Sequence, residues 1–104
     1  MSKSEYIDTV LDLLLTVPRG KVVTYGQIAK KLGSKGLSRV VGNIIHKNPD
    51  GDRYPCYKVV NAKGQLSSSY AFGGIEEQKR RLISDGIEVT GYTVDLQRYL
   101  FGGL

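Results

Sequence analysis

The amino-acid sequence predicts a mainly α-helical fold with a small β element, organised as a single winged helix-turn-helix-like domain. Three observations support this fold class. The 104 residues suffice for one domain with its own core, spanning residues 1–104. Apolar residues recur at helical spacing, and two short helical segments meet at a turn that contains glycine.

A first helix is expected between Ser4 and Pro18. Ser4 can cap its N-terminus, and Glu5 and Asp8 place negative charge near that end, where the helix dipole favours it. The apolar stripe that faces the core is Ile7, Val10, Leu11 and Leu14.

The helix-turn-helix is expected in residues 24–47. Thr24 caps its first helix, Gln27 completes a capping box three residues later, and Gly33 ends the helix. Residues 36–47 form the expected recognition helix. Its apolar stripe is Leu37, Val40, Val41 and Ile44, and its other face carries Arg39, Gly42, Asn43 and His46.

Gly42 lies on the exposed face of this helix, where glycine costs about 1 kcal/mol relative to alanine. The missing side chain allows another backbone to approach closely. Simple tolerance of glycine is the alternative explanation.

The rest of the chain is expected to be less regular, apart from one strand and two helices. The expected segments are a turn at 50–52, a strand at 57–60, a turn at 61–64, a polar loop at 67–74, a helix at 75–84 and a helical turn at 96–101 capped by Asp95.

Positive charge is concentrated in residues 13–49. This stretch has no acidic residue, whereas the whole chain has a formal charge of +5. A one-sided positive field favours a polyanion, most simply nucleic acid, and a solvated basic surface is an equal alternative on charge alone. The basic residues of the stretch are Arg19, Lys21, Lys30, Lys31, Lys35, Arg39 and Lys47.

Several classes of protein are disfavoured. One cysteine and one histidine cannot form an internal disulfide or a cysteine-built metal site, and no cofactor is expected. No apolar run approaches the roughly 20 residues that span a bilayer, and the N-terminus has no apolar signal region. The sequence therefore predicts a cytoplasmic protein without a membrane partner, taken as a monomer.

Cys56 is the single cysteine, and Pro55 restricts the backbone just before it. A lone cysteine is most often a small buried hydrophobic residue, and its alternative role is that of a nucleophile.

Four motifs occur in a fixed order: VTYGQIA at 23–29, SRVVG at 38–42, HKNP at 46–49 and PCYKVV at 55–60. On these motifs, over roughly residues 5–90, the chain resembles the DNA-binding domain of the O6-alkylguanine-DNA alkyltransferases and the related alkyltransferase-like proteins.

This resemblance implies a DNA repair protein that binds duplex DNA through the minor groove and flips an O6-alkylguanine out of the stack. The flip is needed because the alkyl carbon lies inside the duplex, and it costs a few kcal/mol. In the alkyltransferases a cysteine thiolate, a soft and strong nucleophile, then takes the alkyl group in a single turnover.

The resemblance also implies roles for individual residues. Cys56 matches the alkyl acceptor, Arg39 the arginine that fills the space of the extruded base, and Tyr25 the tyrosine that pushes the target phosphate. For Arg39, Tyr25 and Tyr70 the alternatives are a solvated charge and ordinary aromatic packing. The implied DNA-binding residues are Tyr25, Arg39, Gly42, Asn43 and Lys47, and the implied pocket residues are Asn48, Pro55, Tyr70, Ala71 and Phe72.

Two positions next to the chemistry depart from the alkyltransferase pattern. Typical members follow the cysteine with a histidine, which reaches the sulfur through a water and is oriented by a glutamate. Here Tyr57 and Asp85 are expected at those two positions. A neutral phenol is a poor general base at pH 7.

Three functions remain open. The preferred one is transfer of the alkyl group to Cys56. The second is a non-enzymatic sensor that flags the lesion for nucleotide excision repair, because the 104 residues contain no N-terminal alkyltransferase domain and residues 94–101 resemble alkyltransferase-like proteins. Those proteins usually carry tryptophan in place of the cysteine. A third, a major-groove regulator, would leave Cys56 and the Tyr70 loop without a role.

Overall fold

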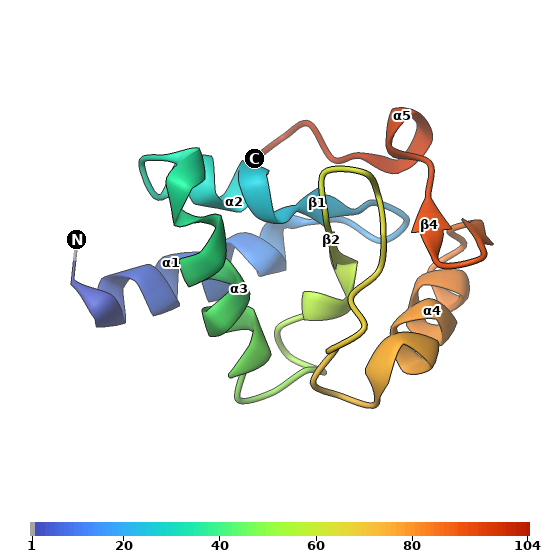
Figure 1. Ribbon diagram of the computed structural model, residues 1–104, viewed down its shortest axis with the longest axis horizontal. Helices are drawn as coiled ribbons and strands as arrows, with labels where there is room; N and C mark the ends of the chain where they lie inside the picture. The colour runs from blue at the N-terminus through green and yellow to red at the C-terminus, as the bar shows by residue number, and fades with distance from the viewer. Residues whose placement is uncertain (1) are drawn as a thin grey trace.

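A computed structural model describes residues 2–104 as a mostly helical bundle with two small sheets (Figure 1). Two 3-10 turns, Lys35–Leu37 and Cys56–Lys58, interrupt the helical part. The helices are α1 (Lys3–Thr16), α2 (Tyr25–Lys31), α3 (Ser38–His46), α4 (Gly74–Ser84) and α5 (Leu96–Tyr99), and the strands are β1 (Val23–Thr24), β2 (Val59–Val60), β3 (Val89–Thr90) and β4 (Thr93–Val94). The predicted fold class is confirmed.

Helix α1 begins earlier than the sequence predicted. Ser2, not Ser4, is the N-cap: its hydroxyl accepts the Glu5 backbone N–H at 3.3 Å, and the Glu5 carboxylate accepts the Ser2 N–H at 3.4 Å. These two bonds satisfy the backbone N–H groups of Ser2 and Glu5, which have no partner within the helix.

The helix-turn-helix forms as expected, with one shift. The capping box of Thr24 and Gln27 is present, with bonds of 2.8 and 3.1 Å. The recognition helix α3 starts at Ser38 because the preceding residues form a 3-10 turn. Its buried residues are Val41 and Ile45, whereas Leu37, Val40 and Ile44 are only half-buried.

The strand expected at 57–60 is shorter. Only β2 pairs, in parallel with β1 (Val23 opposite Val59), and the residues just before it form the 3-10 turn that carries Cys56. Lys58 anchors this turn: its buried ammonium donates to the Val17 carbonyl at 2.8 Å. The antiparallel hairpin of β3 and β4 was not expected, because strands of two residues show no alternating pattern.

Two apolar clusters flank the β1–β2 pair. One joins α1, α2 and α3 to Cys56 and Tyr70, and the other joins α4 to the C-terminal segment. After α5 the chain runs back along β1, where Phe101 N–H donates to the Val22 carbonyl at 2.8 Å. Over the described part of the chain, none of the helices is both long and apolar enough to cross a bilayer.

Candidate nucleic-acid interface and lesion pocket

A cavity of about 400 Å³ opens between α3, the cysteine turn and the 67–74 loop. Its volume lies within the range of about 300–1,000 Å³ that is typical of small-molecule sites. Seven of the residues that the sequence predicted for function line it: Tyr25, Arg39, Gly42, Asn43, Cys56, Tyr70 and Ala71. The cavity also takes in Ile45, His46, Ser67 and Ser69.

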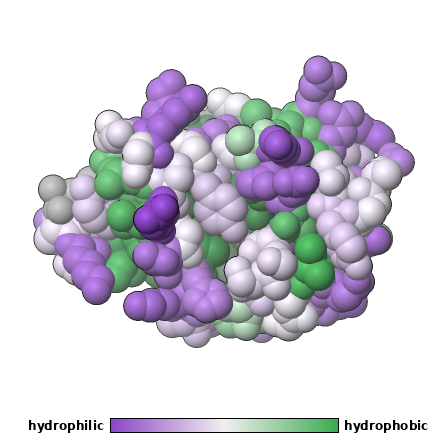
Figure 2. Space-filling model, viewed as in Figure 1, coloured by the Kyte–Doolittle hydropathy of each residue, from purple (hydrophilic) through white to green (hydrophobic). Residues whose placement is uncertain are grey.

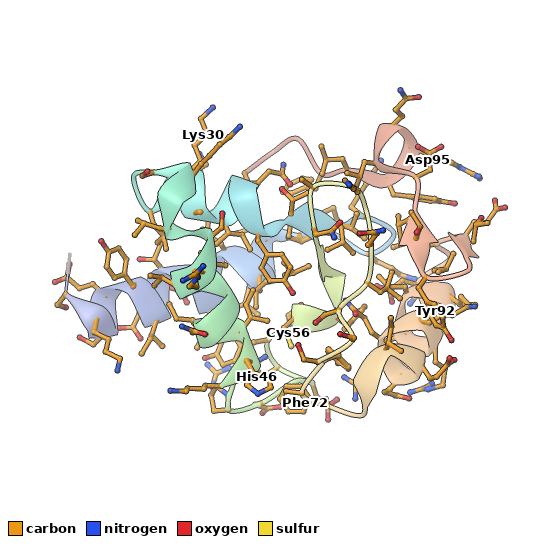
Figure 3. The ribbon with its side chains drawn as sticks, viewed as in Figure 1. Lys30, His46, Cys56, Phe72, Tyr92 and Asp95 are labelled. Carbon is orange, nitrogen blue, oxygen red and sulfur yellow. The ribbon has the colours of Figure 1, made fainter. Side chains whose placement is uncertain are left out.

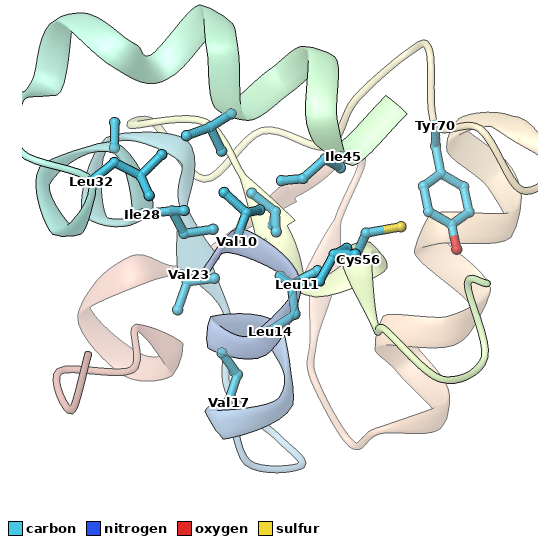
Figure 4. Packing of buried hydrophobic residues seen from close by; sticks show 13 residues of the cluster. Val10, Leu11, Leu14, Val17, Val23, Ile28, Leu32, Ile45, Cys56 and Tyr70 are labelled. Atoms are coloured by element: carbon cyan, nitrogen blue, oxygen red, sulfur yellow. The ribbon is translucent and has the colours of Figure 1, made fainter. Parts of the chain in front are cut away.

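Cys56 closes one end of this cavity and belongs to the core at the same time. The residue is only 2% exposed, and its sulfur points from the core cluster toward the Tyr70 ring (Figure 4). Figure 3 shows the residue between α3 and the loop. Burial raises the pKa of the Cys56 thiol, and a hydrogen bond with Asn48 and the charge of Arg81 only partly oppose this shift.

Tyr57 and Asp85 form a pair outside the cavity. The Tyr57 hydroxyl donates to Asp85 Oδ2 at 2.7 Å, and both residues line a separate small cleft. Burial, together with this hydrogen bond to a carboxylate, raises the pKa of Tyr57 far above its ordinary value. The phenol therefore keeps its proton and cannot act as a base toward Cys56. Next to this pair, the Arg19 guanidinium donates to the Ser84 carbonyl at 2.6 Å and so holds the end of α4.

Tyr70 lines the cavity and also carries an unsatisfied buried polar atom. The residue is 7% exposed, and its buried hydroxyl has no hydrogen-bond partner within residues 2–104. Burial raises the pKa of Tyr70 to about 12, so the hydroxyl remains a donor at neutral pH. A buried hydroxyl without a partner is costly, and a ligand that accepts its hydrogen bond would remove that cost.

Phe72 supports this loop from behind and is not part of the cavity lining. Its ring meets the Tyr70 ring edge-on at 6.0 Å between centroids. It also packs so closely against Gly51 that a Cβ there would lie 2.8 Å from the ring. The side chain thus sets the position of the loop.

A wide trough of about 840 Å³ adjoins the cavity and shares Tyr25, Arg39 and Gly42 with it. It runs along the start of α2 and the exposed face of α3 to the turn at 61–62. Lys30 and Lys35 line it with Arg39, and its described lining includes no acidic side chain. Such a trough suits a phosphate backbone.

Other predicted site residues lie next to the cavity or away from it. Asn48 is buried and braces the loop before Cys56: its amide donates to the Tyr54 carbonyl at 2.8 Å and accepts the Asp50 N–H at 3.1 Å. Pro55 precedes the cysteine turn without lining the cavity. Lys47 lines a different groove, between α1 and α3.

Gln78 is the most important residue that sequence reasoning missed. It is 1% exposed, its amide donates to the carbonyls of Tyr57 and Val59, and its carbonyl oxygen accepts the Ser67 N–H at 2.8 Å. It thus ties α4 to the cysteine turn and to the pocket loop. Gln78 lies on the buried side of a helix that also carries many charged residues, and nothing in the local sequence indicates that it is buried.

The functional groups that line the cavity are thiol, hydroxyl, guanidinium, imidazole and carboxamide groups. Across residues 2–104 no three His, Cys, Asp or Glu side chains are grouped so that they could hold a metal ion.

Residues 5–87 match the family model described as 6-O-methylguanine DNA methyltransferase, DNA binding domain. The chain belongs to this family. The matched range agrees with the resemblance over roughly residues 5–90 that the sequence motifs gave.

Similar proteins in this family carry different names. A bifunctional methyltransferase/endonuclease from Picrophilus torridus is 39% identical over 101 residues, which cover 97% of this chain but only 33% of that protein. A DNA base-flipping protein from Escherichia coli is 35% identical over 91 residues, covering 86% of this chain and 69% of that one. The chain thus spans about a third of the first relative and most of the second.

A solved structure of this family has the same overall fold. The crystal structure of S. pombe Atl1 in complex with damaged DNA containing O6-carboxymethylguanine matches with a TM-score of 0.86 and 31% identity, covering 97% of this chain and 98% of that one. The likeness covers nearly the whole chain and so extends past residue 87, where the family model ends.

In this family member, Gly42→Ala should separate stability from DNA binding. A Cβ at Gly42 meets no atom within 4 Å among the described residues, so α3 accepts alanine and gains up to about 1 kcal/mol of stability. The same methyl group projects into the trough and should weaken binding to duplex DNA. Urea unfolding and fluorescence anisotropy would measure the two effects, and unchanged DNA affinity would show that nothing approaches Gly42 closely.

Proposed function

We propose that this protein binds duplex DNA along the basic trough and holds an extruded O6-alkylguanine in the cavity beside Cys56. One observation carries the proposal: a cavity lined by Cys56 and Tyr70 opens directly onto a trough lined by cations. The names of the relatives, among them a base-flipping protein and Atl1 bound to damaged DNA, support the same reading.

Extrusion needs a group that stabilises the gap left in the stack. Arg39 lies on the exposed face of α3, where trough and cavity meet, so its side chain can enter the duplex as the base leaves. Tyr25 lines both hollows at the start of α2 and can contact the rotated phosphate. Flipping costs a few kcal/mol, which phosphate contacts and pocket contacts must offset.

Inside the cavity the flipped base would meet the Tyr70 side chain and the hydroxyl groups of Ser67 and Ser69. A purine offers ring nitrogens and an exocyclic oxygen as acceptors, so it can accept hydrogen bonds from the two serine hydroxyls.

We further propose that Cys56 accepts the alkyl group slowly. In this step the sulfur–carbon bond forms as the carbon–O6 bond breaks, and the thiol proton is transferred to the guanine. The sulfur is placed for the reaction, but its raised pKa leaves little thiolate at neutral pH, and Tyr57 provides no base. Lesion recognition is therefore the faster activity, and an unrepaired lesion would pass to nucleotide excision repair proteins.

The deciding experiment incubates the protein with duplex DNA that contains O6-methylguanine and weighs the Cys56 peptide over time. Because the thiol pKa is raised, the thiolate fraction and the rate should climb with pH through the alkaline range. The Cys56→Ser variant should bind the lesion without any gain of mass. Tight binding with no methyl gain at any pH would leave the sensor function alone, and no preference for the lesion would contradict the whole proposal.

Replacing Arg39 with alanine should reduce base extrusion more than it reduces binding to undamaged DNA. Fluorescence of 2-aminopurine placed at the target position reports extrusion directly. Arg98→Ala is the matched control, since it removes the same charge from α5, away from trough and cavity. Equal extrusion in both variants would refute the role of Arg39.

A further inference from the structure

Another hollow, of about 420 Å³, lies between α1 and α3, and apolar side chains line most of it. Buried Leu11 forms its floor, and half-buried Ile7, Val40 and Ile44 form its walls. We call it the α1–α3 groove. The helical spacing of Val40 and Ile44 predicted that both lie in the core, yet both are partly exposed to solvent. Figure 2 shows hydrophobic surface at the left of the molecule, over α1 and α3.

The groove and the cavity open on different sides of α3, and Asn43 is the lining residue that they share. At 3.6 residues per turn, Val40 points about 100° away from Arg39 around α3, and Ile44 about 140° away. Gly42 and His46 flank Arg39 on the side that lines the cavity. A molecule seated in the groove therefore does not need to displace DNA from the trough.

The edge of the groove is positive. Exposed Lys3 and Lys47 line it, no acidic side chain belongs to its described lining, and neither lysine forms an ion pair with another residue in 2–104. The phosphate backbone of DNA would satisfy the lysines but offers no large apolar group to fill the space between the walls. A second copy docked groove to groove would bring the lysines of both copies together, which is unfavourable.

We propose that the α1–α3 groove docks a segment of a partner protein that presents aliphatic or aromatic side chains flanked by aspartate or glutamate. The apolar anchors would fill the space between Ile7 and Ile44, and the carboxylates would pair with Lys3 and Lys47. An amphipathic helix in a hydrophobic groove is a common recognition mode. Bound in this way, the partner would sit beside the recognition helix while the lesion is held.

The test selects peptides from a random 12-residue phage library on the protein bound to O6-methylguanine duplex. Enriched peptides should combine apolar anchors with acidic residues. Their affinity, measured by fluorescence anisotropy, should fall about tenfold or more in Ile44→Gln and in Lys3→Glu. Ile83→Gln is the matched control, since Ile83 is 52% exposed on α4, far from the groove in sequence, and it should bind as the parent does.

Lys3→Glu keeps the proposal testable even if Ile44→Gln folds poorly, because an acidic residue in the first turn of a helix is favourable. Both variants should keep their affinity for the lesion duplex, so a failure of DNA binding would be seen separately. The proposal is overturned if selected peptides lack acidic residues, if they bind both variants as tightly as the parent, if the lesion duplex displaces them, or if sedimentation shows a dimer that Ile44→Gln dissociates.

Discussion

Replacing Gln78 with leucine should lower the free energy of unfolding by at least about 3 kcal/mol. Leucine fills a similar volume but leaves the Ser67 N–H and the carbonyls of Tyr57 and Val59 without the bonds that the amide makes. Each buried polar group left unpaired costs about 1–3 kcal/mol. The same change frees the pocket loop at Ser67, so lesion binding should weaken as well.

Urea unfolding followed by circular dichroism measures the stability change. Gln97→Leu is a matched control, since it makes the same chemical change at an exposed position on α5 and should stay within about 0.5 kcal/mol of the parent. Equal unfolding free energies for the two variants would show that the bonds of Gln78 do not stabilise the cysteine turn.

Combining Tyr57→His with Asp85→Glu should speed methyl transfer to Cys56 by about a hundredfold or more, the range in which general bases act. In the structure the long side chain of Tyr57 spans the distance to the short side chain of Asp85. Histidine and glutamate would span it as a short side chain meeting a long one, and they would put a titratable nitrogen on the residue that follows Cys56 in the same 3-10 turn. The imidazole, unlike the locked phenol, can take the proton near pH 7.

The rate of methyl gain at Cys56 over a range of pH measures this change. In the double variant the rise in rate should move to lower pH, because the base then titrates nearer to neutrality. Tyr57→Phe is the control: it removes the bond to Asp85 without supplying a base, and it should transfer as slowly as the parent. If the double variant is no faster, the missing base is not what limits the reaction.

Local signals in the sequence located the helices but not the first residue of every one. The capping box of Thr24 and Gln27 needs only residues three apart, and it appears in the structure as predicted. The same signal is present at the start of α1, where Ser2 and Glu5 have the capping-box spacing, so the prediction of Ser4 as the cap is wrong by two residues.

The lesion pocket could not be derived from local pattern. Its walls come from α2, α3, the cysteine turn and the loop after β2, and they meet through long-range bonds such as those of Gln78. Motif resemblance indicated several of its residues, but the orphaned Tyr70 hydroxyl, the locked state of Tyr57 and the open flank of α3 depend on the three-dimensional arrangement.

The path of the last residues has a consequence for anything attached to them. Phe101 accepts a hydrogen bond from the Gln27 side chain at 2.9 Å, and Leu104 shares a hollow with Lys30 and Lys31 at the end of α2 (Figure 1). Lys30 also lines the trough. A tag or catalytic module fused behind Leu104 would thus start within the positive field of the helix-turn-helix, and a short tether would suffice to deliver it to the damaged strand.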